Sequence, residues 1–496
     1  MVGQSTNSRY DVIVVGAGNA ALTAALSARQ NGARVLVLEK APQSERGGNS
    51  RFSGGIFRFA YDGIEEIKPL RRDMTASEWD LVDVGVYDED RYLGDLMRVT
   101  EGQANRELTQ TLIKQSYTTM TWMTDLGVVW DWSIVWSPRT GERMSFNPGT
   151  AVQAKNKGVG LVHYLFNAVQ QAGIDIAYQA KMIGFLQDDA GHVTGVRIRT
   201  PGGAEDVPAG AVILGSGGFE ANPEMRARYL GPGWDQVKVR GTRFNTGETL
   251  RMALDIGAMP VGHWQGCHAT PIAANAAPVG ALSLTDRTNR LSYPYSIMVN
   301  IQGKRFIDEG EDTGAYTYVK AGRAILTQPR GIAYQIFDSK TVHLIEERYS
   351  TGTPIVGDNI REIAQKMSVP DDALEQTIKE FNASVQPGAF DPAVKDGKRT
   401  VGINPPKSNW ALAIDSPPYT VYPAACGITF TFGGVKIDTE ARVRDTEDIP
   451  IPGLYATGEI TGDFFFHNYP GGTGLMRGAV FGRIGGSNAA AEALGR

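Results

Sequence analysis

The feature that most constrains this chain is a strand–turn–helix–strand pattern near its N-terminus. Residues 12–15 are a short β-branched apolar run, which predicts a buried parallel strand. Gly16, Gly18 and Ala21 follow in the spacing G-x-G-x-x-A. Gly16 permits the tight turn, Gly18 lets the backbone approach a diphosphate, and Ala21 lets the next helix pack closely against the sheet.

A second strand and an acidic residue complete this pattern. The Ala- and Leu-rich residues after the turn suit a helix that stops at Gly32, and the apolar run 35–38 ends at Glu39. A carboxylate at that distance from the glycines can accept a hydrogen bond from a ribose hydroxyl. The pattern predicts an α/β dinucleotide-binding unit, and it leaves FAD and NAD both open.

Composition narrows the class of protein. The 496 residues suit two or three domains, and the net charge of −5 argues against a nucleic-acid partner. No apolar run approaches the ~20 residues of a membrane helix, and the polar N-terminus has no apolar signal region. We therefore expect a cytoplasmic protein that does not span the membrane. Two cysteines and six scattered histidines predict neither a disulfide framework nor a metal site.

A second glycine-rich stretch at 47–55, GGNSRFSGG, decides between the two cofactors. Its amides and hydroxyls suit a diphosphate or one face of a flat ring. Here the chain resembles the flavoprotein subunits of fumarate reductase and succinate dehydrogenase, in which such a segment runs along the flavin. Members that bind FAD covalently carry His just before the Ser. Asn49 stands there in this chain, so the resemblance implies non-covalent FAD.

Four later segments carry the same resemblance. They are 215–219 (GSGGF), 245–248 (NTGE), 452–459 (PGLYATGE) and 468–476 (NYPGGTGLM). In the family the Glu of the third segment binds the ribityl or ribose part of FAD. The fourth segment is a Gly-rich turn that opens a helix, and the helix dipole there suits the charge of a reduced flavin.

The resemblance implies a set of FAD contacts distributed along the whole chain. The residues expected to contact FAD are Gly16, Gly18, Asn19, Ala20, Ala21, Glu39, Lys40, Gly48, Asn49, Ser50, Gly54, Gly55, Gly217, Gly218, Glu248, Glu459, Gly474, Leu475 and Met476.

The expected fold is α/β, with a Rossmann-like FAD-binding domain in two parts and an inserted α+β capping domain. Helical periodicity marks 76–125 and 161–173, and four short strands are expected between 174 and 214. From about residue 266 a strand-like run at 297–301 and a helix at 371–384 resemble the family's mobile cap. We place the FAD-binding domain at 1–265 and 430–496, and the capping domain at 266–429.

The substrate residues of fumarate reductases are mostly changed. Tyr469 stands ten residues past Glu459, where the family has a substrate Arg, and the run 430–434 (FTFGG) lacks the family's His. The capping-domain Arg expected just after Phe337-Asp338 is not evident, whereas His268 resembles the family's substrate histidine. These changes argue against fumarate as the substrate.

Two other branches of the superfamily resemble the chain more closely. The segments 240–243 (RGTR) and 266–268 (GCH) look like tricarballylate dehydrogenase, which oxidises a propane tricarboxylate. Tyr469-Pro470-Gly471 looks like the 3-ketosteroid Δ1-dehydrogenases. Five arginines near the site segments favour a polyanion over a steroid: Arg51, Arg240, Arg243, Arg287 and Arg290.

The reaction that the resemblance implies is dehydrogenation, or its reverse, of a C–C bond next to a carboxylate or carbonyl. The candidate catalytic residues are Tyr469, His268, His467 and Arg243. The Tyr469 phenol could donate a hydrogen bond to a developing enolate. It could instead accept the α-proton, if neighbouring arginines lowered its pKa.

Other readings of these residues stay open. His268 could be a structural core residue, Tyr469 could only pack beside the flavin, and the arginines could face solvent. The substrate is expected to be a polycarboxylate or an enone, and the electron donor or acceptor is not identified. The alternative functions are a 3-ketosteroid Δ1-dehydrogenase, an ene-reductase on another enone, and a non-catalytic flavin electron carrier.

Overall fold

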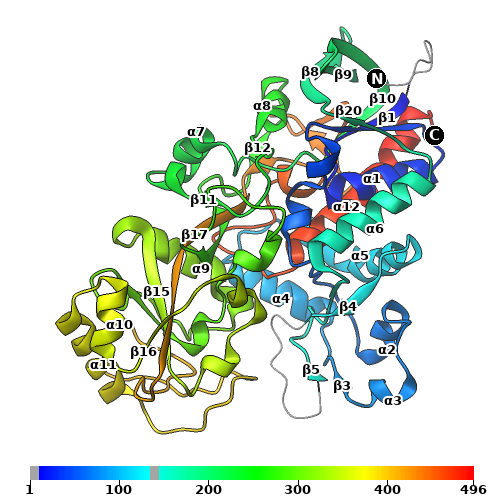
Figure 1. Ribbon diagram of the computed structural model, residues 1–496. Helices are drawn as coiled ribbons and strands as arrows, with labels where there is room; N and C mark the ends of the chain where they lie inside the picture. The colour runs from blue at the N-terminus through cyan, green and yellow to red at the C-terminus, as the bar shows by residue number, and fades with distance from the viewer. Residues whose placement is uncertain (1–9, 134–143) are drawn as a thin grey trace.

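The computed structural model describes residues 10–133 and 144–496 (Figure 1). Its first sheet is built around the N-terminal pattern. β1 lies between β2 and β10 and pairs in parallel with both, so that Val14 stands opposite Val37 and Ile213. The sheet order is β19 (Arg442–Arg444), β20 (Pro450–Ala456), β10 (Gly203–Leu214), β1 (Tyr10–Val15), β2 (Val35–Glu39) and β7 (Asp175–Tyr178).

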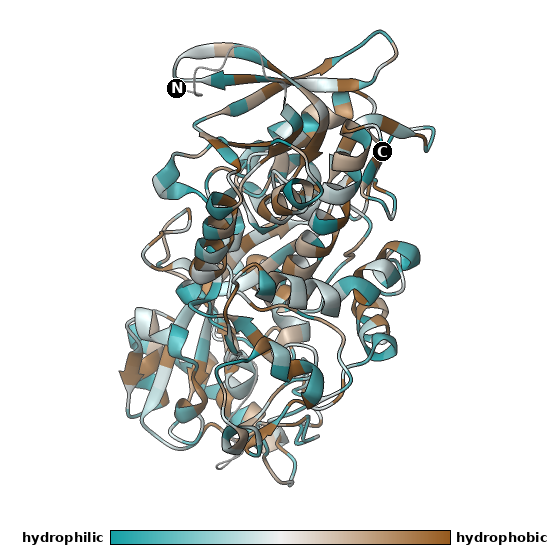
Figure 2. Cartoon of the chain, turned by 90° about the vertical axis from the view of Figure 1, so that its right-hand side faces the viewer, coloured by the Kyte–Doolittle hydropathy of each residue, from teal (hydrophilic) through white to brown (hydrophobic). Residues whose placement is uncertain are grey.

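Burial explains why these strands lack hydrophobic alternation. Val12, Ile13 and Val14 are all fully buried, because helices cover the sheet on its faces. Figure 2 shows long hydrophilic stretches on the outer helices and loops, whereas the central strands are mostly brown or pale. The predicted strand at 12–15 and the predicted strand ending at Glu39 are confirmed.

The first and last helices pack side by side against this sheet. α1 (Asn19–Gln30) contacts α12 (Thr473–Ala493), and a side chain at Gly482 or Gly486 would overlap α1. These glycines are four residues apart, so they share one face of α12 and permit the close approach. The Asn19 side-chain amide donates to Leu475 O at 2.9 Å, which brings the N-termini of the two helices together.

A second sheet forms the part of the molecule farthest from the two ends of the described chain in Figure 1. It has its own buried core, which includes Ile297, Phe381 and Val421. Its strands are β11 (Lys238–Val239), β13 (Cys267–Ala273), β14 (Ile297–Asn300), β15 (Ile332–Phe337), β16 (Ile355–Gly357) and the long β17 (Tyr419–Thr431); its helices are α9 (Gly314–Leu326), α10 (Ile360–Met367) and α11 (Asp371–Ser384).

The remaining elements surround the first sheet or connect it to the second sheet. The helices predicted within 76–125 and 161–173 are present as α3 to α6, and α11 has the predicted bounds. The domain boundaries stay a prediction; β17 runs across the one at 429/430. The elements not yet named are α2 (Ile64–Ile67), α3 (Ala76–Trp79), β3 (Val82–Asp83), α4 (Glu89–Val99), α5 (Arg106–Asp125), β4 (Trp130–Trp132), β5 (Met144–Ser145), β6 (Val152–Ala154), α6 (Lys157–Gln171), β8 (Lys181–Gln187), β9 (Val193–Thr200), α7 (Pro223–Met225), α8 (Glu248–Asp255), β12 (Pro260–Val261) and β18 (Gly434–Val435).

Two expected absences concern the described residues only. No helix within 10–133 and 144–496 combines the length and the apolar character needed to cross a membrane. The same residues contain no group of three or more His, Cys, Asp or Glu side chains with metal-binding geometry.

Candidate functional site

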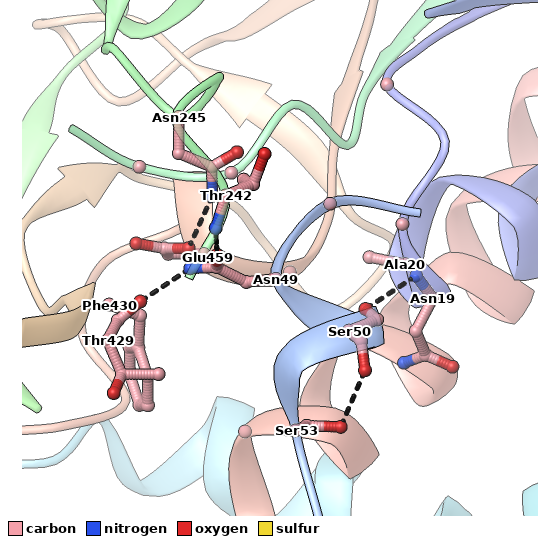
Figure 3. Close-up of a pocket in the computed structure, with 18 of the residues that line it drawn as sticks. Asn19, Ala20, Asn49, Ser50, Ser53, Thr242, Asn245, Thr429, Phe430 and Glu459 are labelled. Carbon is pink, nitrogen blue, oxygen red and sulfur yellow. Dashed lines mark hydrogen bonds between the residues drawn. The ribbon is translucent and has the colours of Figure 1, made fainter. Parts of the chain in front are cut away.

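A single elongated cavity collects the predicted motifs from both ends of the chain. The N-terminus of α1, the 47–55 segment, the 215–218 turn and the start of α12 all line it. Figure 3 shows Ser50 beside Asn19 of α1, and Asn49 beside Thr242 and Glu459, which come from other parts of the chain. Every residue predicted to contact FAD lines the cavity except Ala21 and Met476. Ala21 packs against Gly215, and the Met476 side chain is buried in the core.

One part of the cavity is formed by the N-terminus of α1. Gly16 has φ +106°, and a side chain there would overlap the carbonyl of Gly215. No side chain of the described residues caps α1 at Gly18, and the Asn19 amide donates to Ser50 Oγ at 2.9 Å. The remaining N–H groups of the first turn suit an anion.

Acidic and basic side chains gather at the end of β2. Glu39 is buried and accepts from the Ala41 amide at 2.7 Å; burial raises the pKa of Glu39. Lys40 and Lys181 bind Glu248 at 2.9 and 2.8 Å. Partial burial raises the pKa of Glu248. The hydrogen bonds from Lys181 and Thr246 and the charge of Lys40 outweigh burial and lower this pKa to about 2.

At the other end, Asn49 ties the 47–55 segment to three others. Its amide nitrogen donates to Thr429 O at 2.5 Å and to the carboxyl of Glu220, and its oxygen accepts from the Thr242 amide at 2.8 Å (Figure 3). Glu459 accepts from the Thr431 amide at 2.8 Å. The side chain of Asn49 is therefore fully engaged by the protein.

Two of the four candidate catalytic residues lie in the cavity. The ring centroids of His268 and Tyr469 are 5.2 Å apart, and both rings pack on Phe430. A third aromatic ring, Tyr318 of α9, lies 4.8 Å from His268 and 5.9 Å from Tyr469. Sequence reasoning missed Tyr318, because nothing in the pattern of α9 distinguishes this residue from an ordinary core aromatic.

A hydrogen bond between the two phenols contributes to the pKa of each, and either hydroxyl can be its donor. Burial raises the pKa of Tyr469 to about 12, despite this hydrogen bond and the charges of Arg240, Arg58 and Arg477. The condition under which Tyr469 could accept the α-proton, a pKa lowered by neighbouring arginines, is therefore not met, because desolvation outweighs their charge. Burial and then the Arg240 charge lower the pKa of His268 well below its usual value, so His268 is neutral.

The other two candidates lie outside the cavity, which contradicts their predicted role. The side chain of Arg243 is 60% exposed and pairs with Glu45 at 2.5 Å. The side chain of His467 is 41% exposed, and its backbone amide donates to His263 Nδ1 at 2.9 Å. His467 has a left-handed backbone, and its ring packs beside that of His263 instead of facing Tyr469.

Two buried arginines do line the cavity. Arg240 donates to Thr429 Oγ1 at 2.9 Å and to Phe52 O at 3.0 Å. Arg348 binds Glu346 at 2.5 Å and lies 3.6 Å from Asp286. No sequence pattern singled out Arg348, which lies in a short 3₁₀ helix, Glu347–Thr351, eleven positions beyond Phe337 and farther along the chain than the family's Arg was expected.

Around these arginines several buried polar atoms have no hydrogen-bond partner among the described residues. They all belong to side chains that line the cavity. The atoms are His268 Nδ1, Thr270 Oγ1, Asn289 Oδ1 and Arg348 Nε.

A family model described as "FAD binding domain" matches residues 11–475. The chain belongs to this FAD binding domain family. Among its relatives, a probable fumarate reductase of Shewanella frigidimarina is 30% identical over 97% of this chain and 75% of its own length. A 4-oxocyclohexanecarboxylate 2-dehydrogenase of Sinomonas cyclohexanicum is 27% identical over 98% of this chain and 94% of its own length.

Solved structures agree with the fold. The open conformation of a flavocytochrome c3 fumarate reductase superposes with a TM-score of 0.72 and 27% identity, over 99% of this chain and 79% of that one. A 3-ketosteroid Δ1-dehydrogenase from Sterolibacterium denitrificans gives 0.74 at 20% identity, over 98% of this chain and 100% of that one. The second likeness shows the fold alone. The predicted cofactor and the resemblance to the flavoprotein superfamily are confirmed, and this FAD binding domain protein is an oxidoreductase that acts on CH–CH groups.

The residues present fit FAD. Side chains at Gly16, Gly217 or Gly218 would fill the cradle or overlap its walls, and Asn19 Oδ1 is buried there with no partner among the described residues. The α1 N-terminus suits a diphosphate and the α12 N-terminus suits the flavin. Non-covalent binding stays a prediction, in keeping with an Asn49 that is held by hydrogen bonds.

We expect Glu39→Ala to weaken FAD binding. A carboxylate that accepts from ribose contributes ~1.5–3 kcal/mol, so the dissociation constant should rise about tenfold or more. The measurement is FAD titration of the apoprotein, with Glu107→Ala on the exposed face of α5 as a control that should match wild type. Full flavin occupancy and unchanged affinity in Glu39→Ala would remove Glu39 from the FAD site.

Proposed function

We propose that this enzyme desaturates, or in the reverse direction saturates, the C–C bond next to the ketone of an oxo acid. One observation carries the proposal: a phenol pair and the buried guanidinium groups of Arg240 and Arg348 line the same cavity. A phenol suits a carbonyl oxygen and a guanidinium suits a carboxylate.

Tyr469 is the group assigned to the carbonyl. In the proposed arrangement Tyr318 donates its hydroxyl hydrogen to Tyr469, which leaves the hydrogen of Tyr469 to donate into the cavity. With a pKa of about 12, Tyr469 keeps this hydrogen at neutral pH. A hydrogen bond to the carbonyl oxygen stabilises the enolate that forms when the neighbouring carbon loses its proton.

His268 is the group assigned to that proton. It is neutral, and its buried Nδ1 has no partner among the described residues. The charge of Arg240 is the second cause that holds the pKa of His268 down. A substrate carboxylate beside Arg240 offsets this charge, so binding of an acid makes His268 a better proton acceptor.

The anionic end of the substrate is assigned from a charge count. Around the two carboxylates Asp286 and Glu346 lie three buried guanidiniums: Arg240 and Arg348, which line the cavity, and Arg290, which does not. Lys157 lies 3.9 Å from Asp286, but its side chain is 28% exposed and water screens its charge. One carboxylate balances the buried cluster, whereas a tricarboxylate such as tricarballylate exceeds it.

The two ends lie at different points along β13. His268, at the phenol pair, is two residues from Thr270, which corresponds to roughly 7 Å along a strand. Asn289 bridges to Ile272, farther along in the same direction. A small substrate that contacts both the phenol pair and the guanidinium cluster therefore carries its ketone at one end and its carboxylate at the other.

The chemistry divides between cofactor and protein. FAD, when bound, supplies the two-electron hydride acceptor of desaturation or the hydride donor of the reverse reaction. The protein binds the carboxylate, orients the ketone and moves the α-proton. A 3-ketosteroid is the second candidate, but its apolar rings would lie against the buried guanidinium groups of Arg240 and Arg348. The relative that acts on 4-oxocyclohexanecarboxylate supports the oxo acid.

The test is an anaerobic titration of the oxidised, FAD-loaded protein that follows the flavin absorbance. The panel is 4-oxocyclohexanecarboxylate, cyclohexanone, cyclohexanecarboxylate, tricarballylate and a 3-ketosteroid. We expect the oxo acid to bleach the flavin fastest. Faster bleaching by tricarballylate or by the steroid would contradict the proposal.

A further inference from the structure

Two carboxyl groups meet at the wall of the FAD cavity. Glu459 lines the cavity, and Glu220 lies fully buried behind it. The amide nitrogen of Asn245 is 2.7 Å from Glu220 Oε1 and 3.4 Å from Glu459 Oε2, so one donor reaches both groups (Figure 3 shows Asn245 above Glu459). A hydrogen bond with Glu459 contributes, after burial and the charge of Glu459, to the raised pKa of Glu220.

The oxygen atoms of Glu220 show where a proton belongs. Oε1 accepts from the side-chain amides of Asn49 and Asn245. Oε2 is buried and finds no donor among the described residues. Ionised carboxylates only accept, so a hydrogen bond between two of them requires a proton on one. A hydrogen on Oε2, directed at Glu459, satisfies both observations.

The charged groups around Glu220 and Glu459 do not neutralise a second negative charge on the pair. The guanidinium of Arg226 donates hydrogen bonds to four backbone carbonyls, one of which belongs to Glu220 itself. Arg477 donates to Thr461 O, and its charge acts on Glu459. Burial raises the pKa of the Cys267 thiol to about 12, so it is neutral. The charge of Arg226 acts on Glu220, but an ionised Glu220 would have no ion-pair partner within 10–133 and 144–496 and would stay buried beside Glu459.

The surrounding glycines make room for this arrangement. A side chain at Gly217 would overlap the Asn245 amide, and one at Gly218 would overlap the Glu459 carboxyl. Through Asn49 and Asn245 the pair also holds the 47–55 segment and the 240–249 segment, both of which line the cavity. The pair is thus part of the wall that FAD meets.

We propose that Glu220 carries a proton shared with Glu459, and that the protein retains FAD only while this proton is in place. Losing it would put two negative charges into one buried pair. Bound FAD excludes water from Glu459, which makes the second charge costlier still. By linkage, FAD binding and retention of the proton favour each other. This inference rests on FAD binding and not on the substrate.

The sign of the pH effect follows from the surroundings. Burial and then the charge of Glu459 raise the pKa of Glu220 well above its usual value. The proton is therefore kept through the ordinary carboxyl range and is lost only at higher pH. FAD affinity should be constant at low pH and fall as the pH rises through the raised pKa, by up to about tenfold per pH unit for one proton.

The first experiment measures the FAD dissociation constant of wild type and Glu220→Gln between about pH 6 and pH 10 by flavin fluorescence. Gln keeps an acceptor for the two Asn amides and a donor toward Glu459, but it cannot ionise. We expect the constant to rise with pH in wild type and to stay flat in Glu220→Gln, with Glu107→Gln following wild type. Parallel profiles for wild type and Glu220→Gln would overturn the proposal.

The second experiment uses infrared spectroscopy of the FAD-loaded protein and does not depend on an altered affinity. At pH 8 wild type should show the C=O stretch of a protonated carboxyl group, and Glu220→Gln should lose it. Burial also raises the pKa of Glu39 and Asp463, so the assignment rests on the difference between the two proteins. If Glu220→Gln does not fold, Glu459→Gln is the substitute: the band should remain but move, because its partner has changed. A spectrum without a protonated carboxyl at pH 8, or a band that neither variant alters, would overturn the proposal.

Discussion

Tyr469→Phe should slow the reduction of bound FAD by the true substrate about 10²–10⁴-fold, the usual contribution of a positioned acid or base. The ring packs against His268, Phe430 and Phe465 with centroids 5.1 to 5.2 Å away, and Phe preserves all three contacts. Only the hydroxyl is lost, and with it the hydrogen bond to the substrate carbonyl. FAD content should stay that of wild type.

The measurement is the single-turnover rate of flavin bleaching after rapid mixing with substrate, once FAD content has been determined. Tyr117→Phe, on the partly exposed face of α5, is the matched control and should react like wild type. Because burial holds the pKa of Tyr469 near 12, the Tyr469-dependent part of the rate should not vary between about pH 6 and 9. A Tyr469→Phe rate within about threefold of wild type would make the hydroxyl a bystander.

The sequence predicted the nucleotide half of this site well because its signals are local. The turn at Gly16, the approach at Gly18 and the acid at Glu39 are separated by fixed numbers of residues along one βαβ unit. Spacing alone therefore places them around one cavity. Ala21 was predicted both to contact FAD and to let the helix pack closely against the sheet; the structure places it against Gly215 and outside the cavity lining.

The substrate half could not be predicted in this way. Arg240 and Arg243 are three residues apart in a loop with no helical or strand period, and only the fold decides that Arg240 turns inward. Tyr318 and Arg348 come from separate segments of the second sheet's surroundings. Tyr318 lies beside Tyr469, and Arg348 lines the same cavity, only because of how these segments pack, which no short motif encodes.

Glu220 was missed for a related reason. It directly follows the glycine-rich turn at 215–219, and a sequence reader assigns an acid there to the surface. Its burial becomes understandable only with Asn49, Asn245 and Glu459 in view, which are brought together from three distant segments. Buried acids with polar partners are thus the residues that sequence patterns least reveal.

Arg348→Gln should reduce kcat/KM for an oxo acid about 30- to 5,000-fold, the range expected when one partner of a buried charge pair is truncated. Arg348 Nε is buried without a partner among the described residues, and its remaining nitrogens face Glu346 and Asp286. A substrate carboxylate would complete its hydrogen bonding. Gln keeps a donor but removes the charge and the planar fork.

The comparison between two substrates separates binding from folding. The matched neutral ketone has no carboxylate, so its already low kcat/KM should be the same in Arg348→Gln and in wild type. A merely structural effect would instead lower the rate for both compounds. Arg399→Gln, an exposed arginine within the same 266–429 segment, should change neither value. If kcat/KM falls in the same proportion for the oxo acid and the neutral ketone, Arg348 has a structural role and does not bind the carboxylate. The anionic end of the substrate must then be assigned to Arg240 alone.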